Sequence, residues 1–303
     1  MCEHVAAGQN VVGNMILGFE IGGTRVRAAQ AAPAGLVHLG EIETPCNGLA
    51  PFVDGLAGFL RGCEAGIAIS MAGIIDPDTG RIKVANIPGI DGTCIAAELQ
   101  TRLGLPVTIL NDADCFALAE AKHGAGRGHR SVFGIILGTG VGGGLVLDGR
   151  VVTGAGGFAG EWGHGPVLHD PALPCGCGQT GCLDTIGGAR GLERLYFYLH
   201  GAHLSAPDIL AAWRSGKDMG TVARWLDLVS GPLAMVVNVV GASILPVGGG
   251  LANAPDLIAA LDLALRARIL RKTDMPLVVP AICGSDAGLI GAVEAGRAAF
   301  GGV

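Results

Sequence analysis

The stretches GFEIGGTRVRAA at residues 18–29 and IILGTGVGGGLVL at residues 135–147 share one pattern: an apolar run, a glycine loop and a second apolar run. Two apolar runs joined by a glycine-rich turn are typical of paired β-strands. Because the pattern occurs once in each half of the chain, we predict a duplicated architecture in which each half supplies one glycine loop to a shared cleft. The alternative is a pair of unrelated β-hairpins with glycine turns.

The sequence of these loops favours phosphate binding by the backbone. Gly138, Gly140 and Gly143 match the G-x-G-x-x-G dinucleotide fingerprint, but that fingerprint needs a helix directly afterwards, and here a hairpin pattern continues. The P-loop sequence G-x-x-x-x-G-K-[ST] does not occur. Hairpin loops can bind anions through backbone N–H groups without a lysine. The phosphate-binding residues that we predict are Gly22, Gly23, Thr24, Gly138, Thr139 and Gly140.

Short apolar runs alternate with helical periodicity along the whole chain, which indicates an α/β fold. A chain of 303 residues is long enough that two domains are expected. We predict strands at residues 15–20, 26–31, 36–41, 66–71, 106–110, 132–137, 144–147, 243–247 and 277–279. We predict helices at residues 49–63, 112–123, 221–240, 256–270 and 287–300, and a short helix opened by the capping box Ser205–Asp208. The acidic first turn of the helix at 112–123 suits a helix N-terminus.

The composition excludes several classes of protein. Half of the residues are hydrophobic, 15% are charged and the formal net charge is −6, so the basic face of a nucleic-acid-binding protein is not expected. The first residues lack the basic start and long apolar core of a signal peptide. The longest apolar run, residues 232–247, is shorter than the ~20 residues that a membrane span needs. We therefore predict a soluble, cytoplasmic protein with no nucleic-acid or membrane partner.

Residues 159–182, AGEWGHGPVLHDPALPCGCGQTGC, bring His164 and three cysteines close together. His164, Cys175, Cys177 and Cys182 are the ligand set of a closed, tetrahedral zinc site, in which no position is left open for water. The glycines between the cysteines let the backbone turn tightly enough for the thiols to converge. Glu161 precedes the histidine by three residues, so the clamped segment also carries a carboxylate.

The other cysteines are isolated in apolar segments, where a free cysteine is commonly a small buried hydrophobe. Disulfides are disfavoured, because three clustered thiols leave one unpaired and nothing marks the chain as secreted. The isolated cysteines are Cys2, Cys46, Cys63, Cys94, Cys115 and Cys283.

Taken together and in this order, the motifs resemble those of ROK-family sugar kinases. The resemblance covers nearly the whole chain from about residue 15, and residues 111–121 and 137–144 look most like bacterial N-acetylglucosamine kinases. The motifs are GGT at 22–24, NDADCFALAEA at 111–121, LGTGVGGG at 137–144, GEWGH at 160–164, CGCGQTGC at 175–182 and GGGL at 248–251.

The resemblance implies an actin-like ATPase fold of the hexokinase type, with two α/β domains around a cleft. The implied domains are residues 1–113 plus 287–303, and residues 114–286 with the zinc-binding loop. The implied activity is ATP-dependent phosphorylation of the 6-hydroxyl of N-acetyl-D-glucosamine. Mg²⁺ would accompany ATP, Zn²⁺ would be structural, and the family commonly forms homodimers.

The resemblance also implies roles for individual residues. Asp112 would accept the proton of the sugar hydroxyl as this attacks the γ-phosphate of ATP; the alternative role for Asp112 is a helix cap. His164 would contact the sugar as well as the zinc, so the metal would orient a sugar-binding side chain. Other implied sugar contacts are Ser70, Gly73, Asn86, Asn111, Glu161 and Asp184. Other implied nucleotide contacts are Glu20, Gly248, Gly249 and Gly250.

Two residues depart from the family pattern. Glu20 stands where the first phosphate loop normally begins with Asp, close to the Mg²⁺ and the transferred phosphate. Asp184 stands where the family has a Glu that contacts the sugar. Neither change removes a charge, so we expect catalysis to be retained and the acceptor preference to be the property affected.

Other functions compete with this one. Glucose, N-acetylmannosamine and fructose are alternative acceptors within the kinase class. The family includes transcriptional repressors, but the fourteen residues before the first predicted strand cannot form a DNA-binding domain, and no basic patch is present. A sugar sensor without catalysis is a third alternative, suggested by Glu20, but Asp112 and both loops speak against it.

Overall fold

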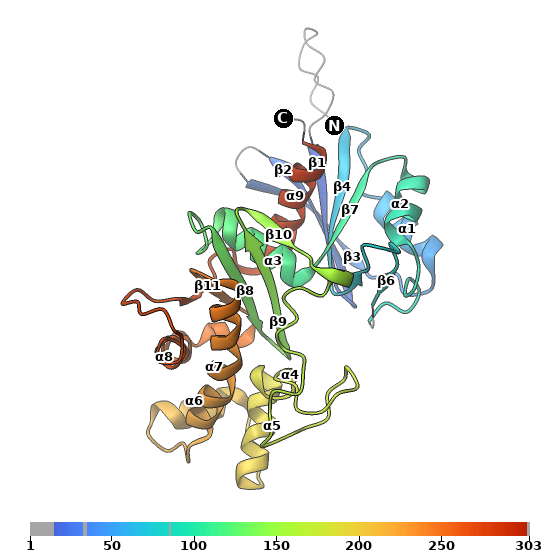
Figure 1. Cartoon of the computed structure of the whole chain (residues 1–303). Coiled ribbons are helices and arrows are strands. Elements are labelled where there is room, and N and C mark those ends of the chain that lie inside the picture. The colour runs from blue at the N-terminus through green and yellow to red at the C-terminus, as the bar shows by residue number, and fades with distance from the viewer. Residues whose placement is uncertain (1–14, 33–34, 85, 302–303) are drawn as a thin grey trace. The chain divides into compact units, whose positions relative to one another are not determined.

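The computed structural model describes residues 15–32, 35–84 and 86–301. The chain divides into two compact units, Met1–Leu110 with Ala292–Val303, and Asn111–Gly291. Each unit is built on a five-stranded sheet of its own (Figure 1). The first fourteen residues, including Cys2, lie outside the described part of the chain.

The sheet of the first unit has the strand order β3-β2-β1-β4-β7. Strand β1 pairs antiparallel with β2 and parallel with β4, and β2 pairs antiparallel with β3. Phe19 and Ile69 of the sheet are buried with Phe52 and Leu56 of α1 in one core. The elements are β1 (Met15–Ile21), β2 (Arg25–Ala32), β3 (Gly35–Glu43), α1 (Leu49–Ala57), β4 (Glu64–Met71), β5 (Ile74–Ile75), β6 (Ile82–Lys83), α2 (Ile95–Leu103) and β7 (Val107–Asn111).

The sheet of the second unit has the order β10-β9-β8-β11-β12. Strand β8 pairs antiparallel with β9 and parallel with β11, and β9 pairs antiparallel with β10. The elements are α3 (Asp112–His123), β8 (Ser131–Leu137), β9 (Val141–Leu147), β10 (Arg150–Val152), η1 (Ala155–Gly157), α4 (Asp184–Gly187), α5 (Ala189–His200), α6 (Ala206–Arg214), α7 (Thr221–Val240), β11 (Leu245–Gly248), η2 (Gly250–Asn253), α8 (Pro255–Arg266), β12 (Val278–Pro280) and η3 (Gly284–Asp286). The last helix, α9 (Ala287–Phe300), begins in the second unit, and its residues from Ala292 onward belong to the first.

The two sheets repeat one order of pairing. In each, a three-stranded antiparallel meander is extended on its other side by two more strands, the first of them parallel to the strand that begins the meander. The duplication predicted from the two glycine loops is therefore confirmed for the sheets. The shared cleft stays a prediction.

Several predicted boundaries were wrong because turns follow the helices. The helix predicted at 49–63 ends at Ala57, where Gly58 closes the last turn and Phe59 and Leu60 continue in tighter turns. The helix predicted at 256–270 is α8, which ends at Arg266. Strand β9 begins at Val141 rather than at residue 144, so three glycines belong to the strand and not to the loop.

Three helices were not predicted at all. Helix α2 has weak apolar periodicity, and α4 is only four residues long. Helix α5 follows the cysteine cluster directly, without a side-chain N-cap that would have marked its start. Of the isolated cysteines in the described residues, Cys115 is buried as predicted. Cys46 is exposed, and Cys63, Cys94 and Cys283 are partly exposed.

Helix α7 is long and apolar enough to cross a membrane by length and composition alone. Its Trp225, Val229 and Leu233 are nevertheless buried in the core of the second unit. The same features occur in the core helix of a globular unit, and we describe α7 as one.

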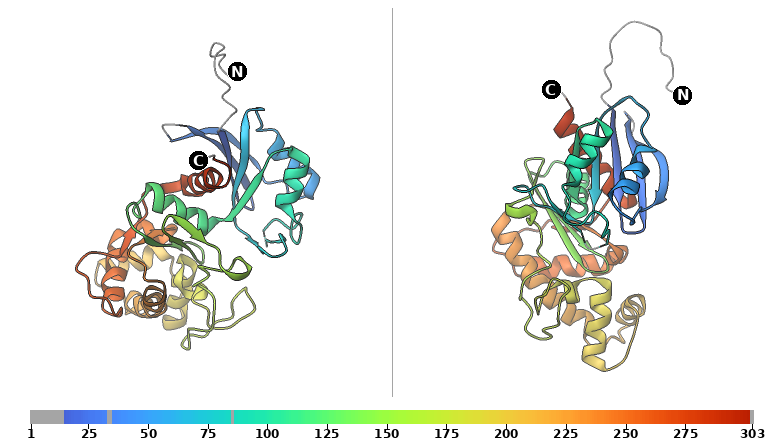
Figure 2. Two further views of the ribbon diagram at one scale, coloured as in Figure 1. Left: turned by 45° about the horizontal axis from the view of Figure 1, so that its top comes forward. Right: turned by 90° about the vertical axis from the view of Figure 1, so that its right-hand side faces the viewer.

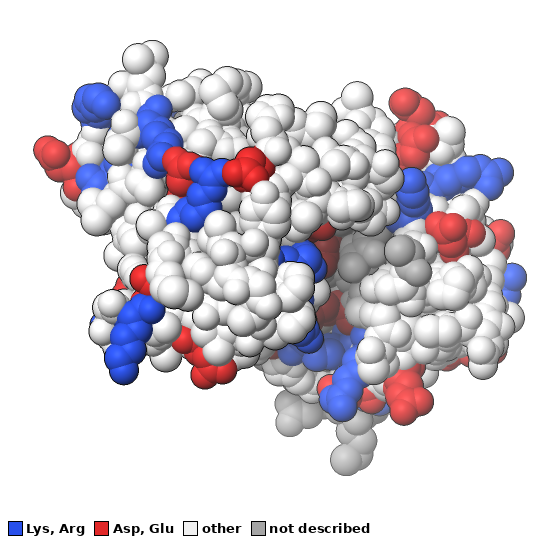
Figure 3. Space-filling view, turned by 90° about the horizontal axis from the view of Figure 1, so that it is seen from below, with Lys and Arg blue, Asp and Glu red and all other residues white. Residues whose placement is uncertain are grey.

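On the face shown in Figure 3, Lys and Arg side chains are interspersed with Asp and Glu side chains.

Helix α3 lies against the second sheet (Figure 1; Figure 2). At this contact strand β9 consists of glycines, Gly142 to Gly144. A Cβ atom added at Gly144 would lie 2.5 Å from the carbonyl oxygen of Ala113, and one added at Gly143 would lie 2.6 Å from Trp162. Successive residues of a strand face opposite sides of the sheet. The glycines of β9 therefore admit the backbone of α3 on one face and the indole of Trp162 on the other.

We expect Gly144→Ala to lower the free energy of unfolding by about 1–3 kcal/mol, because the added methyl group would push two backbones apart. Denaturant unfolding measures the change. Gly231→Ala in α7 is the matched control: its Cβ meets nothing within 4 Å, so it should be neutral or stabilising by up to about 1 kcal/mol. Equal stability of Gly144→Ala and the wild type would contradict the close approach of α3.

Candidate functional site

The first turn of α3 presents the predicted base at the end of strand β7. Asn111 is the N-cap, and its Oδ1 accepts a hydrogen bond from the N–H of Ala113 at 2.8 Å. Asp112 also accepts from this N–H, through Oδ1 at 3.0 Å. Capping is thus mainly the work of Asn111, and the second carboxylate oxygen of Asp112 has no hydrogen bond within the described residues.

Three carboxyl groups interact around this turn. Asp112 keeps contact with solvent, yet the surrounding protein atoms withdraw enough water to raise its pKa. Burial raises the pKa of Asp114 to about 7, and the charges of Glu161 and Asp112 contribute. Burial also raises the pKa of Glu161, which His164 partly offsets. Such raised values are typical of functional sites.

Glu161 and His164 lie on the segment that follows β10. The carboxylate Oε2 of Glu161 is 3.8 Å from Nε2 of the His164 ring, and both side chains are about one-third exposed, at 28% and 32%. The other ring nitrogen, Nδ1, is 3.7 Å from the sulfur of Cys175. One imidazole therefore faces a carboxylate on one side and the cysteine cluster on the other.

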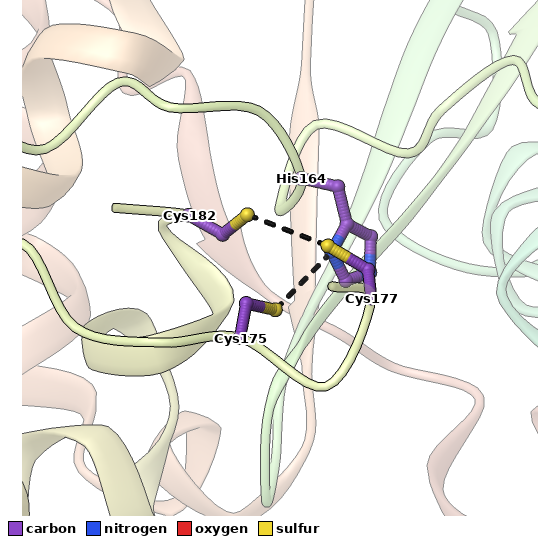
Figure 4. Close-up of side chains that lie close together, drawn as sticks. All are labelled: His164, Cys175, Cys177 and Cys182. Atoms are coloured by element: carbon purple, nitrogen blue, oxygen red, sulfur yellow. Dashed lines mark hydrogen bonds between the residues drawn. The ribbon is translucent and has the colours of Figure 1, made fainter. Parts of the chain in front are cut away.

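The four predicted zinc ligands point toward one another (Figure 4). Their ligand atoms all lie within 4.8 Å of one another, and the sulfurs of Cys177 and Cys182 are 3.6 Å apart. With Zn–S bonds of about 2.3 Å, the edge of a tetrahedral site is about 3.8 Å. The residues present thus fit a four-coordinate zinc ion.

The surroundings of the cluster act on its thiols in opposite directions: burial raises the pKa of the Cys175 thiol to about 12, whereas other contacts favour a thiolate. The N–H of Gly165 donates to the sulfur of Cys182 at 3.4 Å. A backbone hydrogen bond from Gln179 lowers the pKa of the Cys177 thiol to about 7. Cys175 begins a tight turn, in which its carbonyl oxygen accepts from the N–H of Gly178 at 3.0 Å.

Asp184 connects the cysteine cluster to the second glycine loop. Its Oδ1 accepts from the N–H of Val141 at 2.8 Å, and its Oδ2 lies 3.8 Å from the sulfur of Cys175. A Cβ atom at Gly140 would lie 2.2 Å from Oδ1, so a larger residue there would displace the carboxylate of Asp184. The carboxylate of Asp184, whose side chain is one methylene shorter than the Glu of the family pattern, thus has both of its contacts within the protein.

The second glycine loop, Gly138 to Gly140, contacts the start of α5 and the residues that follow β11. Helix α5 begins there, because the N–H of Ala189 donates to the carbonyl oxygen of Gly138 at 2.7 Å. Gly249, at the end of β11, adopts φ +85°, and a Cβ there would lie 2.5 Å from the carbonyl carbon of Leu137. The structure thus brings the predicted nucleotide residues Gly138–Gly140 and Gly248–Gly250 together.

A cavity of about 640 Å³ opens beside this loop. Two arginines of α5, Arg190 and Arg194, line it, and Arg194 also donates through Nε to the carbonyl oxygen of Thr185 at 2.8 Å. Guanidinium groups near a glycine loop suit an anionic ligand. Other residues of the lining are Thr139, Gly140, Cys175 and Asp184.

In the first unit, the loop at Gly22–Thr24 forms a tight turn, in which the N–H of Gly22 donates to the carbonyl oxygen of Arg25 at 2.9 Å. Asn86 lies beside this loop, since a Cβ at Gly23 would be 3.1 Å from Asn86 Cβ. Glu20 is held through Oε2 by the guanidinium of Arg27, whose Nε donates at 2.8 Å.

The two remaining predicted sugar contacts lie at the end of β4. Ser70 is completely buried, and its hydroxyl oxygen has no hydrogen-bond partner among the described residues. Gly73 lies close to the carbonyl oxygen of Lys83 and to Val84.

The sequence analysis missed three residues of the second unit. Asp114 was included in an acidic first turn that suits the helix dipole, although its side chain is buried. Trp162 lies within the GEWGH motif, and its Nε1 donates to the carbonyl oxygen of Gly142 at 2.9 Å. Arg190 was missed because α5 itself was not predicted.

Comparison with known proteins agrees with this geometry. Residues 16–296 match the ROK family. The chain belongs to the ROK family. It is 34% identical over 296 residues to an N-acetyl-D-glucosamine kinase of Photobacterium profundum, covering 92% of this chain and 98% of that one.

Solved structures show the same fold. A ROK hexokinase from Thermus thermophilus superposes with a TM-score of 0.83 at 31% identity, covering 95% of this chain and 100% of that one. A ROK glucokinase from Streptomyces griseus, solved with glucose and AMPPNP, superposes with a TM-score of 0.72 at 26% identity, covering 94% and 100%. The fold is the actin-like ATPase fold of the hexokinase type, as predicted.

We expect Cys177→Ser to lose most of the bound zinc, because replacing even a residue that supports a ligand costs about 10–100-fold in metal affinity. Metal analysis of the purified protein measures the zinc per chain, and Cys46→Ser is the matched control outside the cluster. A wild type without zinc, or a Cys177→Ser variant with a full complement, would contradict the site.

Proposed function

We propose that this chain is an ATP-dependent sugar kinase that transfers the γ-phosphoryl group to the 6-hydroxyl of N-acetyl-D-glucosamine. Relatives that the chain resembles are named N-acetyl-D-glucosamine kinase, and its structural neighbours include a hexokinase and a glucokinase. The observation that carries the proposal is Asp112, which is held at the start of α3 with one carboxylate oxygen unengaged by the described residues.

Asp112 is proposed to act as the base. It would accept a hydrogen bond from the 6-hydroxyl and then its proton as the oxygen attacks phosphorus. Phosphoryl transfer depends mostly on positioning and charge stabilisation, so orienting the hydroxyl is the larger part of this role. The raised pKa of Asp112 makes the carboxylate a stronger base than a fully hydrated aspartate.

The other polar residues predicted from the sequence are proposed to contact the sugar. Asn111, Glu161 and His164 lie on the same segments as Asp112 or on the clamped loop, and they offer donors and acceptors for hydroxyl groups. Asp184 was predicted as a contact, and its bonds to Val141 and Cys175 support instead a role in fixing the loop. The other proposed contacts are Ser70, Gly73 and Asn86.

The glycine loops would hold the phosphates of ATP through backbone N–H groups, and Mg²⁺ bound with ATP would supply positive charge. Gly22, Gly23 and Thr24 are proposed for one loop and Gly138, Thr139 and Gly140 for the other. Glu20 retains a carboxylate near its loop, where Arg27 fixes one oxygen. Gly248, Gly249 and Gly250 would let the adenosine approach the backbone closely.

Zinc is proposed to be structural. His164 would bind the ion through Nδ1, which faces the cysteines, and would turn Nε2 toward Glu161. Three thiolates and one imidazole leave no open coordination position, so the ion would orient the sugar-binding loop without touching the reacting atoms. The homodimer, the cytoplasmic location and the domain limits 1–113 plus 287–303 and 114–286 remain predictions.

We expect N-acetylglucosamine to have the highest kcat/KM among N-acetylglucosamine, N-acetylmannosamine, glucose, mannose and fructose. Release of ADP with Mg²⁺-ATP, measured in a coupled assay, tests this directly. A preference for another sugar would keep the kinase and replace the acceptor. Sugar binding without turnover of any of the five, in folded protein that contains zinc, would favour a sensor and contradict the proposal.

A further inference from the structure

We propose that Asp114 is a positioning residue: a buried, neutral carboxyl group whose deprotonation displaces the first turn of α3 and takes Asp112 out of its working position. The proposal rests on the function proposed above, because Asp112 is the base of that reaction. Asp114 itself touches neither substrate nor the reacting atoms.

The position of Asp114 leaves one oxygen of its carboxyl group, Oδ1, buried without a hydrogen bond. The residue is 4% exposed, and its Oδ1 has no hydrogen-bond partner in the described part of the chain. It is the third residue of α3, and a Cβ atom at Gly144 of β9 would lie 2.9 Å from its Cα. An ionised carboxylate at such a place would be buried without a donor, which is costly.

The other buried carboxyl groups of the described chain are satisfied very differently. Glu120, two turns later on the same helix, accepts three backbone hydrogen bonds, from Ala125, Ile282 and Cys283, at 2.7–2.9 Å. Asp262 accepts from two backbone N–H groups and pairs with Arg266. The fold thus supplies donors where it holds a buried carboxylate, and it supplies none to Oδ1 of Asp114.

The charges around Asp114 are of one sign. Asp112 on the same turn and Glu161 on the clamped segment are the charges that act on it most strongly. Strands β8, β9 and β11, which pack against α3, carry no ionisable side chain. Arg150 of β10 pairs with Leu147, which is three residues beyond Gly144 along β9. Lys122 and His123 lie at the opposite end of α3.

A proton on Asp114 resolves this conflict. Burial and the two neighbouring carboxylates raise its pKa to about 7, so the group is mostly neutral below that pH. When Asp114 loses the proton, a negative charge appears beside these acidic groups, at a place where Oδ1 has no donor within the described residues. The first turn of α3 can relieve the strain only by moving toward water, and Asp112 moves with it.

The stability of the protein should also change with pH. The pKa of Asp114 is raised in the folded protein above its ordinary value of about 3.8. The folded state therefore holds the proton more tightly than the unfolded chain does, and the stabilisation is fully present below about pH 4. It is lost progressively as the pH rises toward 7.

The test compares the wild type with Asp114→Asn, which replaces the carboxyl group by a neutral group of the same size. Turnover and melting temperature are measured from about pH 5 to about pH 9, and Asp54→Asn, at an exposed position of α1, is the control that leaves both profiles unchanged. We expect kcat of the wild type to fall about tenfold between about pH 6 and about pH 8. In Asp114→Asn this fall should disappear, and melting temperature should depend less on pH.

Asp114→Ala also lacks the titrating group, so its kcat and melting temperature should depend as little on pH, at a lower melting temperature overall. This variant replaces Asp114→Asn in the test if the Asn variant does not fold. Profiles of Asp114→Asn that superimpose on those of the wild type would overturn the proposal. If no sugar is phosphorylated, the proposed function fails, and melting still decides on Asp114. A pH dependence of melting that is unchanged in Asp114→Asn rejects the buried proton, and a flattened one supports it.

Discussion

The close contact between helix α3 and the bare backbone of strand β9 is the constraint on which the candidate site depends. Gly142, Gly143 and Gly144 have no side chains, so α3 approaches β9 on one face and Trp162 on the other. This contact fixes the first turn of α3 against the sheet. Asp112 and Asp114 are both on that turn, and its position therefore sets where the proposed base lies.

A second set of interactions fixes the loop that carries Glu161. His164 joins this loop to the cysteine cluster, and Asp184 joins the cluster to the second glycine loop through the N–H of Val141. A zinc ion in the cluster would thus stiffen the proposed sugar-binding and phosphate-binding segments together. In the proposed function, a closed metal site would then support catalysis without taking part in it.

Much of the fold could be predicted from the sequence, because local patterns determine it. The two glycine loops with flanking apolar runs predicted the paired sheets, and the Asp148-Gly149 turn adopts the positive φ angles of a tight hairpin. Helices α3, α7 and α9 have the predicted bounds. The N-cap Asn111 marks the start of α3, and the left-handed Gly241 marks the end of α7. Helix α5 lacked such a signal, and the glycine turn after α1 shortened a helix that periodicity alone extended.

Only those parts of the candidate site whose residues lie close together in one segment could be predicted from the sequence. Three cysteines and a histidine in one segment predicted the cluster that the structure shows. Asp114 could not be identified in this way, because burial and a missing hydrogen bond depend on the packing of α3 against β9. The contact of Asp184 with Val141 likewise joins residues that are far apart in the chain. Such properties follow from tertiary contacts and not from local pattern.

The measurement that tests the account most directly is turnover of Asp112→Asn with N-acetylglucosamine and Mg²⁺-ATP, taken beside the affinity of the variant for the sugar. The account predicts that kcat falls by about 100-fold or more, because general-base catalysis contributes about that much. Sugar affinity should stay within about threefold of the wild type, since an amide of the same shape can still hydrogen-bond a hydroxyl group. Unchanged turnover would remove Asp112 from the role of base and contradict the account.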